Sequence, residues 1–109
     1  MATINYTSEE NVIAGIVKVE WAGLSANDDG QMFDCTGLKI ASVHTGGNFG
    51  SGGNLYLHAS NELSPSSFLQ WQKIENPSIG ELNYPMFGAI KPVADAAISS
   101  VKVAIIFVR

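Results

Sequence analysis

Residues 44–61, HTGGNFGSGGNLYLHASN, decide the fold of this chain. The glycine-rich centre, GGNFGSGG, lies between segments 38–45 and 54–59, in which alternate residues are apolar. A period of two residues is typical of β-strands, and glycines supply the positive φ angles that a wide turn needs. The stretch therefore predicts a central glycine-rich β-hairpin within an all-β chain, an antiparallel β-sandwich of the jelly-roll or immunoglobulin-like type.

The expected register of this hairpin follows from its turn. With the turn centred near residue 50, opposite residues have an index sum of about 100. One face then carries three apolar pairs: Ala41 with Ala59, Val43 with Leu57 and Thr45 with Leu55. The other face mixes aliphatic, aromatic and imidazole groups: Ile40, Ser42, His44, Tyr56 and His58. We expect this second face to be partly exposed and available to another subunit.

The remaining segments predict strands laid around the hairpin. Residues 1–11 are polar and predict a leading arm, whereas residues 12–109 predict one β-sandwich domain. Residues 12–21 alternate, with Ile13 and Trp21 on the inward face. Residues 68–74 also alternate, with Trp71 inward, and polar loops flank them at 60–67 and 75–84. Two short segments predict edge strands, 31–35 and the proline-bounded 85–92.

The last segment, VKVAIIFVR at 101–109, is apolar on both faces in its second half. A strand of this type has to be covered on both sides, so we expect Ile106 and Val108 to meet another subunit. Phe49, in the glycine loop, either caps the core or projects at the tip. The expected interaction surface comprises Ile40, His44, Phe49, Tyr56, His58, Ile106 and Val108.

Composition limits the functional classes. Apolar residues make up 46% of the 109, charged residues 15%, and the net charge is −4, which fits a packed domain with apolar surface left for a partner. No basic stripe suits nucleic acid. No apolar run is long enough to span a bilayer, and residues 1–10 lack the pattern of a signal peptide, so we expect synthesis in the cytoplasm. The single cysteine, Cys35, allows no intrachain disulfide and suits a small core residue.

No motif predicts catalysis, a cofactor or a metal site. The glycines at 46–53 precede a strand, whereas a phosphate-binding loop precedes a helix. Asp28 and Asp29 lack the further oxygen ligands of a calcium loop. His44 and His58 are not paired with each other in the expected register. The carboxylates fall in loops and strand edges without a partner for acid–base chemistry, so we expect no enzyme activity.

Residues 47–62, followed by Trp71, resemble a family of small virion proteins of tailed bacteriophages. The family pattern is roughly G-T-F-G-S-G-T-V-T-L-x-G-S-N-D-G-x-x-W, and this chain reads GNFGSGGNLYLHASNE before Trp71. Residues 19–34 resemble the family's W-x-G-L-x-x-G-D-x-G segment, and residues 87–92 its Y-I-R-P strand. The chain departs at Ala59 and at Glu62-Leu63, where the family has Gly and Asp-Gly, and its loop before Trp71 is longer.

The resemblance implies a structural protein on the capsid surface of the virion. It suggests a head decoration, or cement, protein that binds the major capsid protein and bridges capsomers. We expect it to be a homo-oligomer, a dimer or a trimer. The alternative is a glycan- or surface-binding sandwich of a phage tail or fibre, because exposed Trp71, Tyr56 or Phe49 could stack on a sugar ring.

Overall fold

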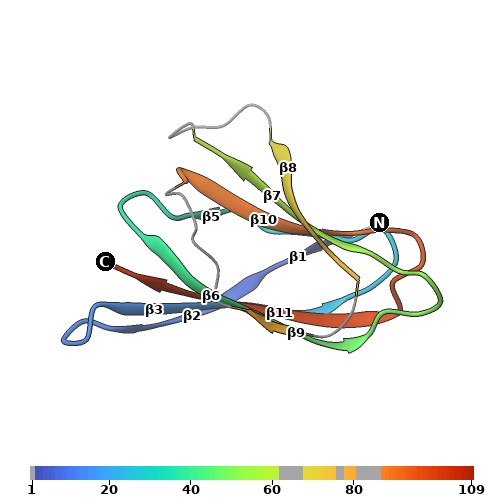
Figure 1. The fold of residues 1–109 in the computed structure, drawn as a ribbon, viewed down its shortest axis with the longest axis horizontal. Coiled ribbons are helices and arrows are strands. Elements are labelled where there is room, and N and C mark those ends of the chain that lie inside the picture. The colour runs from blue at the N-terminus through green and yellow to red at the C-terminus, as the bar shows by residue number, and fades with distance from the viewer. Residues whose placement is uncertain (1, 62–67, 76–77, 81–86) are drawn as a thin grey trace.

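The computed structural model describes residues 2–61, 68–75, 78–80 and 87–109, and only the backbone of 78–80. All regular structure in this part of the chain is β, in two sheets that face each other (Figure 1). None of these residues forms a helix that could cross a membrane. The segments with a two-residue apolar period thus form strands, and the strands form a β-sandwich, as predicted.

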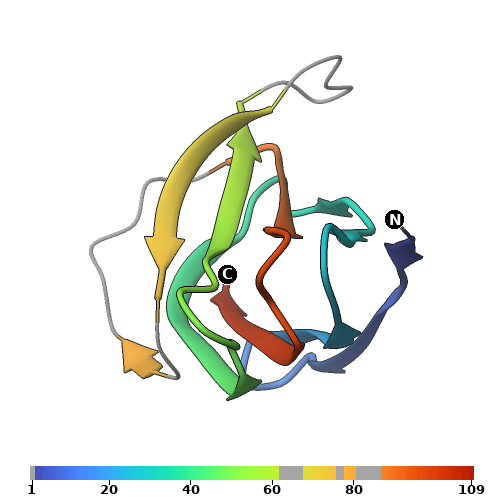
Figure 2. The same cartoon turned by 90° about the vertical axis from the view of Figure 1, so that its right-hand side faces the viewer.

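The strands are distributed over two sheets. Sheet A has the order β1 (Thr3–Ile4), β4 (Asp29–Gly30), β10 (Ala89–Ala94), β7 (Leu55–Ser60), β8 (Leu69–Ile74), and β5 (Phe33–Asp34) also pairs with β10. Sheet B has the order β2 (Tyr6–Asn11), β3 (Ile16–Leu24), β11 (Ser100–Val108), β6 (Lys39–Asn48), β9 (Ser78–Gly80). Figure 2 shows the chain passing repeatedly from one sheet to the other.

This strand order is that of a jelly roll. Four antiparallel pairs are nested along the chain: β3 with β11, β4 and β5 with β10, β6 with β9, and β7 with β8. Rolling up this long double ribbon brings β6 beside β11 and β7 beside β10. The result is a pair of four-stranded sheets, extended on one side by β1 and β2.

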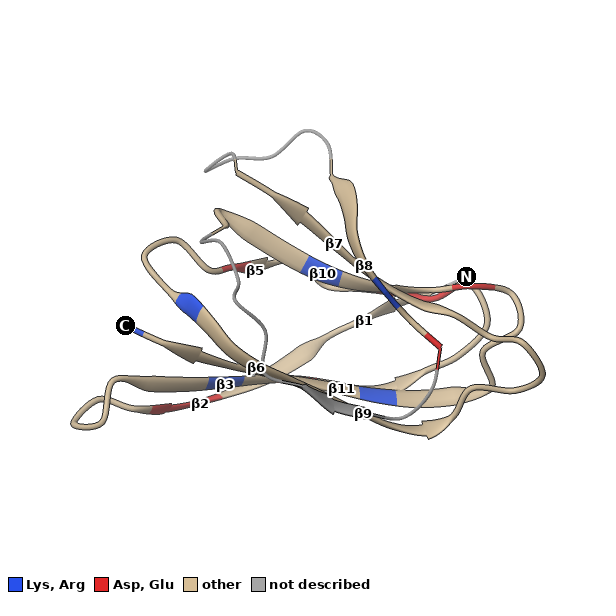
Figure 3. Ribbon diagram, in the orientation of Figure 1, with Lys and Arg blue, Asp and Glu red and all other residues tan. Residues whose placement is uncertain are grey.

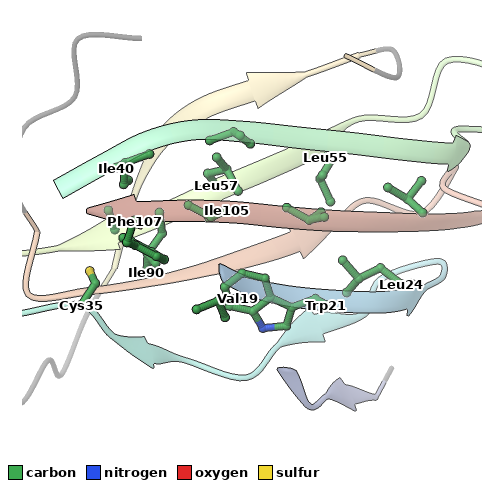
Figure 4. Close-up of a cluster of buried hydrophobic side chains, with 14 of the residues drawn as sticks. Val19, Trp21, Leu24, Cys35, Ile40, Leu55, Leu57, Ile90, Ile105 and Phe107 are labelled. Carbon is green, nitrogen blue, oxygen red and sulfur yellow. The ribbon is translucent and has the colours of Figure 1, made fainter. Parts of the chain in front are cut away.

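The core lies between the sheets and is formed by alternate residues of the long strands (Figure 4). Trp21 and Phe107 are its largest fully buried side chains. The Trp21 indole Nε1 donates a hydrogen bond to the Gln31 carbonyl oxygen at 2.9 Å, which satisfies the one polar atom of this ring. Cys35 is also buried, as expected of a small core residue.

The predicted central hairpin is wrong, although its inward face is right except at Ala41, which is only partly buried. β6 belongs to sheet B and β7 to sheet A, so the two strands do not pair. Val43, Leu55, Leu57 and Ala59 are nevertheless buried, because they face one another across the core. An alternating pattern defines which face of a strand is apolar, but it does not distinguish a neighbour in the same sheet from one in the opposite sheet.

The glycine loop makes this crossing possible. Gly47 and Gly50 have φ of 107° and 69°, in the left-handed region that glycine adopts without strain. A Cβ on Gly50 would lie 2.1 Å from the Ala97 carbonyl oxygen. The loop therefore rests against the turn between β10 and β11, and Phe49 is buried rather than at an exposed tip.

The first fifteen residues also differ from expectation. Residues 3–11 are no arm, since β1 pairs with β4 and β2 pairs with β3 along its whole length. The predicted strand at 12–21 begins at Ile16 instead, because 12–15 form the turn between β2 and β3. Ile13 is fully exposed in this turn, not inward.

The segment predicted as an edge strand at 85–92 is β10, a central strand of sheet A. On one side of β10, Val93 pairs with β4 and Ile90 pairs with β5, and the residues between them have no ladder partner there. Pro92 lies in this interval, where its missing N–H costs no ladder hydrogen bond. The Pro92 ring instead packs over Gly30, whose Cβ position would be 2.4 Å from Pro92 Cδ. Residues 85–86, and residues 62–67 of the loop predicted at 60–67, lie outside the described part of the chain.

Two register shifts explain two further differences. Between Ile106 and Phe107 the ladder to β6 skips Ala41, so that Ile40 turns inward opposite Phe107 and becomes core. The ladder between β7 and β8 skips Trp71, since Leu57 pairs with Gln72 and His58 with Gln70. Trp71 is consequently only partly buried, and Leu69 is 77% exposed.

Candidate interaction surfaces

The expected interaction surface divides into three places. Ile40 and Phe49 are 5% and 6% exposed, so they belong to the core and cannot contact a partner. His44, Ile106 and Val108 lie on the outer face of sheet B. Tyr56 and His58 lie on the outer face of sheet A, on the opposite side of the molecule. The expected single face does not exist, because β6 and β7 are in different sheets.

The outer face of sheet B has an apolar centre. Val108 on β11 lies directly opposite Ile16 on β3, and Ile106 lies opposite Lys18. Side chains opposite each other in an antiparallel ladder are in contact distance. Ile106 and Val108 are partly exposed, and within the described part of the chain no segment covers this face.

The apolar centre continues onto the turn between β2 and β3. Val12 and Ile13 are 77% and 102% exposed, and Ile16 at the start of β3 is 38% exposed. We call the combined surface the tip patch: Val12, Ile13, Ile16, Ile106 and Val108. The sequence reasoning missed its first two residues, although Asn11 and Gly15, which bracket them, are turn formers.

Several interactions hold the tip patch in place. The Asn11 side-chain oxygen accepts a hydrogen bond from the Ala14 N–H at 3.0 Å, and the Gly15 carbonyl accepts one from the Arg109 N–H at 3.0 Å. The Arg109 guanidinium also pairs with the Glu10 carboxylate. The turn is thus anchored to the end of β11, which holds its backbone in one conformation.

The outer face of sheet A is more polar. His58 lies directly opposite Lys91, whose Nζ is 3.6 Å from the Asp29 carboxylate and 5.0 Å from the centre of the Phe68 ring. Partial burial, and then the charge of Lys91, lower the pKa of His58 below its ordinary value. His58 is therefore neutral at pH 7, and the cation on this face already has its own partners.

A shallow groove of about 370 Å³ lies at the β7–β8 end of sheet A. Trp71 and Phe87 line it with an edge-to-face ring pair whose centroids are 5.0 Å apart. Asn61 and Gln70 add amide groups, and the exposed Leu69 stands at the side. Aromatic rings beside amides suit a ligand that is apolar on one face and polar at its rim.

Ser42 and His44 form the contact most like a catalytic pair. The Ser42 Oγ is 2.9 Å from His44 Nε2, within the range for a nucleophile and its base. They sit on the same side of β6, two residues apart, on the open outer face of sheet B. The backbone N–H groups around them bond in the ladders to β11 and β9, so they are not available as an oxyanion hole.

Two aspartates have structural roles, the buried Asp28 and the exposed Asp34. Both oxygens of Asp28 accept backbone N–H groups, from Ala2 at 3.0 Å and Ser25 at 2.9 Å. Hydrogen bonds from the Thr36 hydroxyl and amide lower the pKa of Asp34. Burial raises the pKa of the Cys35 thiol to about 11, which keeps it protonated and unreactive. Among the described residues no cluster of histidine, cysteine and carboxylate groups could hold a metal ion.

Asp95 connects the glycine loop to the turn after β10. Its carboxylate accepts hydrogen bonds from the Asn54 backbone and side-chain N–H groups and from the Ala97 N–H, at 2.9–3.0 Å. Burial raises the pKa of Asp95, but these hydrogen bonds lower it more, so the pKa lies below its ordinary value. The ionised carboxylate is therefore the form that stabilises the folded chain.

We expect this carboxylate to contribute to acid unfolding. A pKa lowered by folding gives stability that is present above the unfolded value, near 3.8, and lost as the pH falls through the folded value. The free energy of unfolding, measured from pH 6 to pH 2 in denaturant, should fall less steeply in Asp95→Asn than in the parent chain. Equal slopes in the two proteins would show that the Asp95 contacts do not depend on its charge.

No protein family, no curated protein and no solved structure matches this chain.

Proposed function

We propose that this chain is a structural protein of a tailed-phage particle, a head decoration protein that binds the outer capsid lattice and stabilises it by bridging capsomers. The tip patch carries the proposal: an exposed apolar surface, held rigid by the chain, on a compact jelly roll. Exposed apolar patches of this kind mark sites of protein association. The likeness of residues 47–62 to small virion proteins points to the particle as the place of that association.

The distribution of ionisable groups supports a binding role over a catalytic one. Asp28, Asp34 and Asp95 accept hydrogen bonds from the chain's own turns, and the Cys35 thiol is buried. These groups stabilise the fold and do not converge on the groove at Trp71. Jelly rolls recur in viral capsid and lectin domains, an analogy at the level of the fold that agrees with both candidate functions discussed here.

Attachment to a lattice tolerates weak individual contacts. Oligomers that engage several capsomers at once gain about 10²–10⁴ in effective affinity where the geometry allows. A dimer or trimer of this chain with one tip patch per subunit would bind a shell in this way. A small patch on each subunit is then sufficient for attachment, because several patches bind the shell at once.

The copy number in purified particles tests this proposal. Quantitative mass spectrometry against the major capsid protein of the same particles should give a ratio that corresponds to hundreds of copies. A few copies per particle would place the chain in a tail or fibre, and its absence from particles would contradict a structural role altogether.

A glycan-binding role is the second candidate, and the groove at Trp71 favours it. The groove joins a partly buried aromatic pair to the amides of Asn61 and Gln70, which can bond to hydroxyl groups. Binding on a glycan array that is lost in Trp71→Ala, with the circular dichroism spectrum unchanged, would establish this role. Equal array signals from the parent and Trp71→Ala would exclude the groove as the binding site.

A further inference from the structure

We infer that the tip patch docks onto a capsid-protein surface with an apolar socket flanked by carboxylates. The inference rests on the proposed function and specifies the face that the chain turns toward the shell. Three features support it: the lysines on this face, the exposed apolar side chains of the turn, and the hydrogen bonds that hold the turn in place.

The charge distribution singles out this face. The chain has six Lys and Arg residues, and four of them pair with a carboxylate: Lys73 with Glu75, Lys91 with Asp29, Lys102 with Glu20, and Arg109 with Glu10. Lys18 and Lys39 have no carboxylate within ion-pair distance in the described part of the chain. Both lie on the outer face of sheet B.

These two lysines stand on either side of the apolar centre. Lys18, on β3, lies between Glu9 of β2 and Ile106 of β11, and Lys39, on β6, lies opposite Val108 of β11. Figure 3 shows basic segments on β3, β6 and β11, the three strands that form this part of sheet B. Among the described side chains, this face carries three lysines, Lys18, Lys39 and Lys102, against two glutamates, Glu9 and Glu20. Their net charge is +1, whereas the whole chain has a net charge of −4.

A complementary partner therefore presents carboxylates around an apolar depression. Long-range attraction to acidic groups orients the encounter, and burial of the apolar side chains supplies the lasting contact. Three of the five most exposed large apolar side chains in the described residues are Val12, Ile13 and Ile16, so the contact would centre on the turn.

The anchoring of the turn reduces the cost of docking. Binding usually orders flexible groups and loses affinity for doing so. Here the Asn11–Ala14 and Gly15–Arg109 hydrogen bonds already define the turn conformation. The turn projects from one end of the sandwich (Figure 1), so it can dock without first changing its conformation.

Co-sedimentation with empty shells tests the inference. The probe is shells assembled from the major capsid protein of the phage that encodes this chain, without the chain itself. Ile13→Asp and the double variant Lys18→Glu/Lys39→Glu should each bind at least about tenfold more weakly than the parent protein. Binding of the parent should also weaken as sodium chloride is raised from about 0.05 to 0.5 M.

Matched controls lie in sheet A. Leu69→Asp places the same charge at a 77% exposed apolar residue, and Lys73→Glu reverses a lysine on β8. Both should bind shells within about twofold of the parent. Ile13 and Leu69 are exposed, so these substitutions leave the core unchanged, and circular dichroism verifies the fold of each variant.

The outcomes separate the two proposals. If the parent binds shells and the tip-patch variants bind equally well, the docking face is wrong while the decoration role stands. If the parent does not bind shells, the decoration role fails and the inference fails with it. If Ile13→Asp abolishes self-association in sedimentation equilibrium and leaves shell binding intact, the patch joins copies of this chain and the inference is overturned.

Discussion

Replacing Trp21 with alanine should remove a large part of the stability of this domain. Trp21 is fully buried, and its indole fills the space between Gly30, Pro92 and Tyr6. Truncation of a buried tryptophan costs about 3–5 kcal/mol, and the Gln31 carbonyl would lose its hydrogen-bond donor as well. A domain of this size has a total stability of about 5–15 kcal/mol. Urea unfolding followed by circular dichroism measures the loss.

Two other variants calibrate this result. Trp21→Phe keeps most of the apolar volume but has no N–H to donate, and should lose about 1–3 kcal/mol. Trp71→Ala, at the partly buried tryptophan of β8, should lose less than Trp21→Ala. Equal losses at Trp21 and Trp71 would contradict the placement of Trp21 at the centre of the core.

Gly50→Ala should destabilise the chain more than Gly52→Ala or Gly46→Ala, two other substitutions in the glycine loop. The residue has φ of 69°, and the added Cβ would lie 2.1 Å from the Ala97 carbonyl oxygen. The backbone strain alone costs about 1–3 kcal/mol, and the clash forces the loop away from the turn after β10. We expect a loss of more than about 2 kcal/mol, measured by urea unfolding.

The neighbouring glycines separate strain from contact. Gly52 has φ of 75° but open space around its Cβ position, so Gly52→Ala measures the strain by itself. Gly46 has neither a positive φ nor a neighbour within 4 Å, and Gly46→Ala should change stability by less than about 0.5 kcal/mol. If Gly50→Ala were no worse than Gly46→Ala, the loop would not rest against the β10–β11 turn as described.

The sequence predicted inward faces better than strand partners. The alternation in residues 54–59 correctly placed Leu55, Leu57 and Ala59 in the core. It could not show that β7 pairs with β10, which is thirty residues away in the chain, instead of β6. Pairing depends on the path of the whole chain around the core, and the local pattern is the same for either partner.

Local irregularities account for some of the wrong predictions. The bulge at Ala41 turns the Ile40 side chain from the outer face of β6 into the core. The amino-acid sequence alone does not show where such a bulge occurs. Pro92 favours an edge strand because proline has no N–H to donate. In the structure it lies in the central strand β10, beside the break between β4 and β5, where no ladder hydrogen bond is lost. Val12 and Ile13 are β-branched and apolar, which favours a strand, so the sequence does not predict the exposed turn that they form.

The outer residues of β11 show where sequence reasoning was more successful. Ile106 and Val108 were singled out because they are apolar on the side opposite the core, and they do form part of the open face of sheet B. Their role in binding a partner stays a prediction.

An image reconstruction of the intact phage particle tests the central claim most directly. Density for this chain should lie on the outer shell, repeated over the capsomers, with the turn between β2 and β3 and the outer face of sheet B directed at the capsid protein. Density in which sheet A faces the shell, or in which the chain occupies only the tail, would contradict the account.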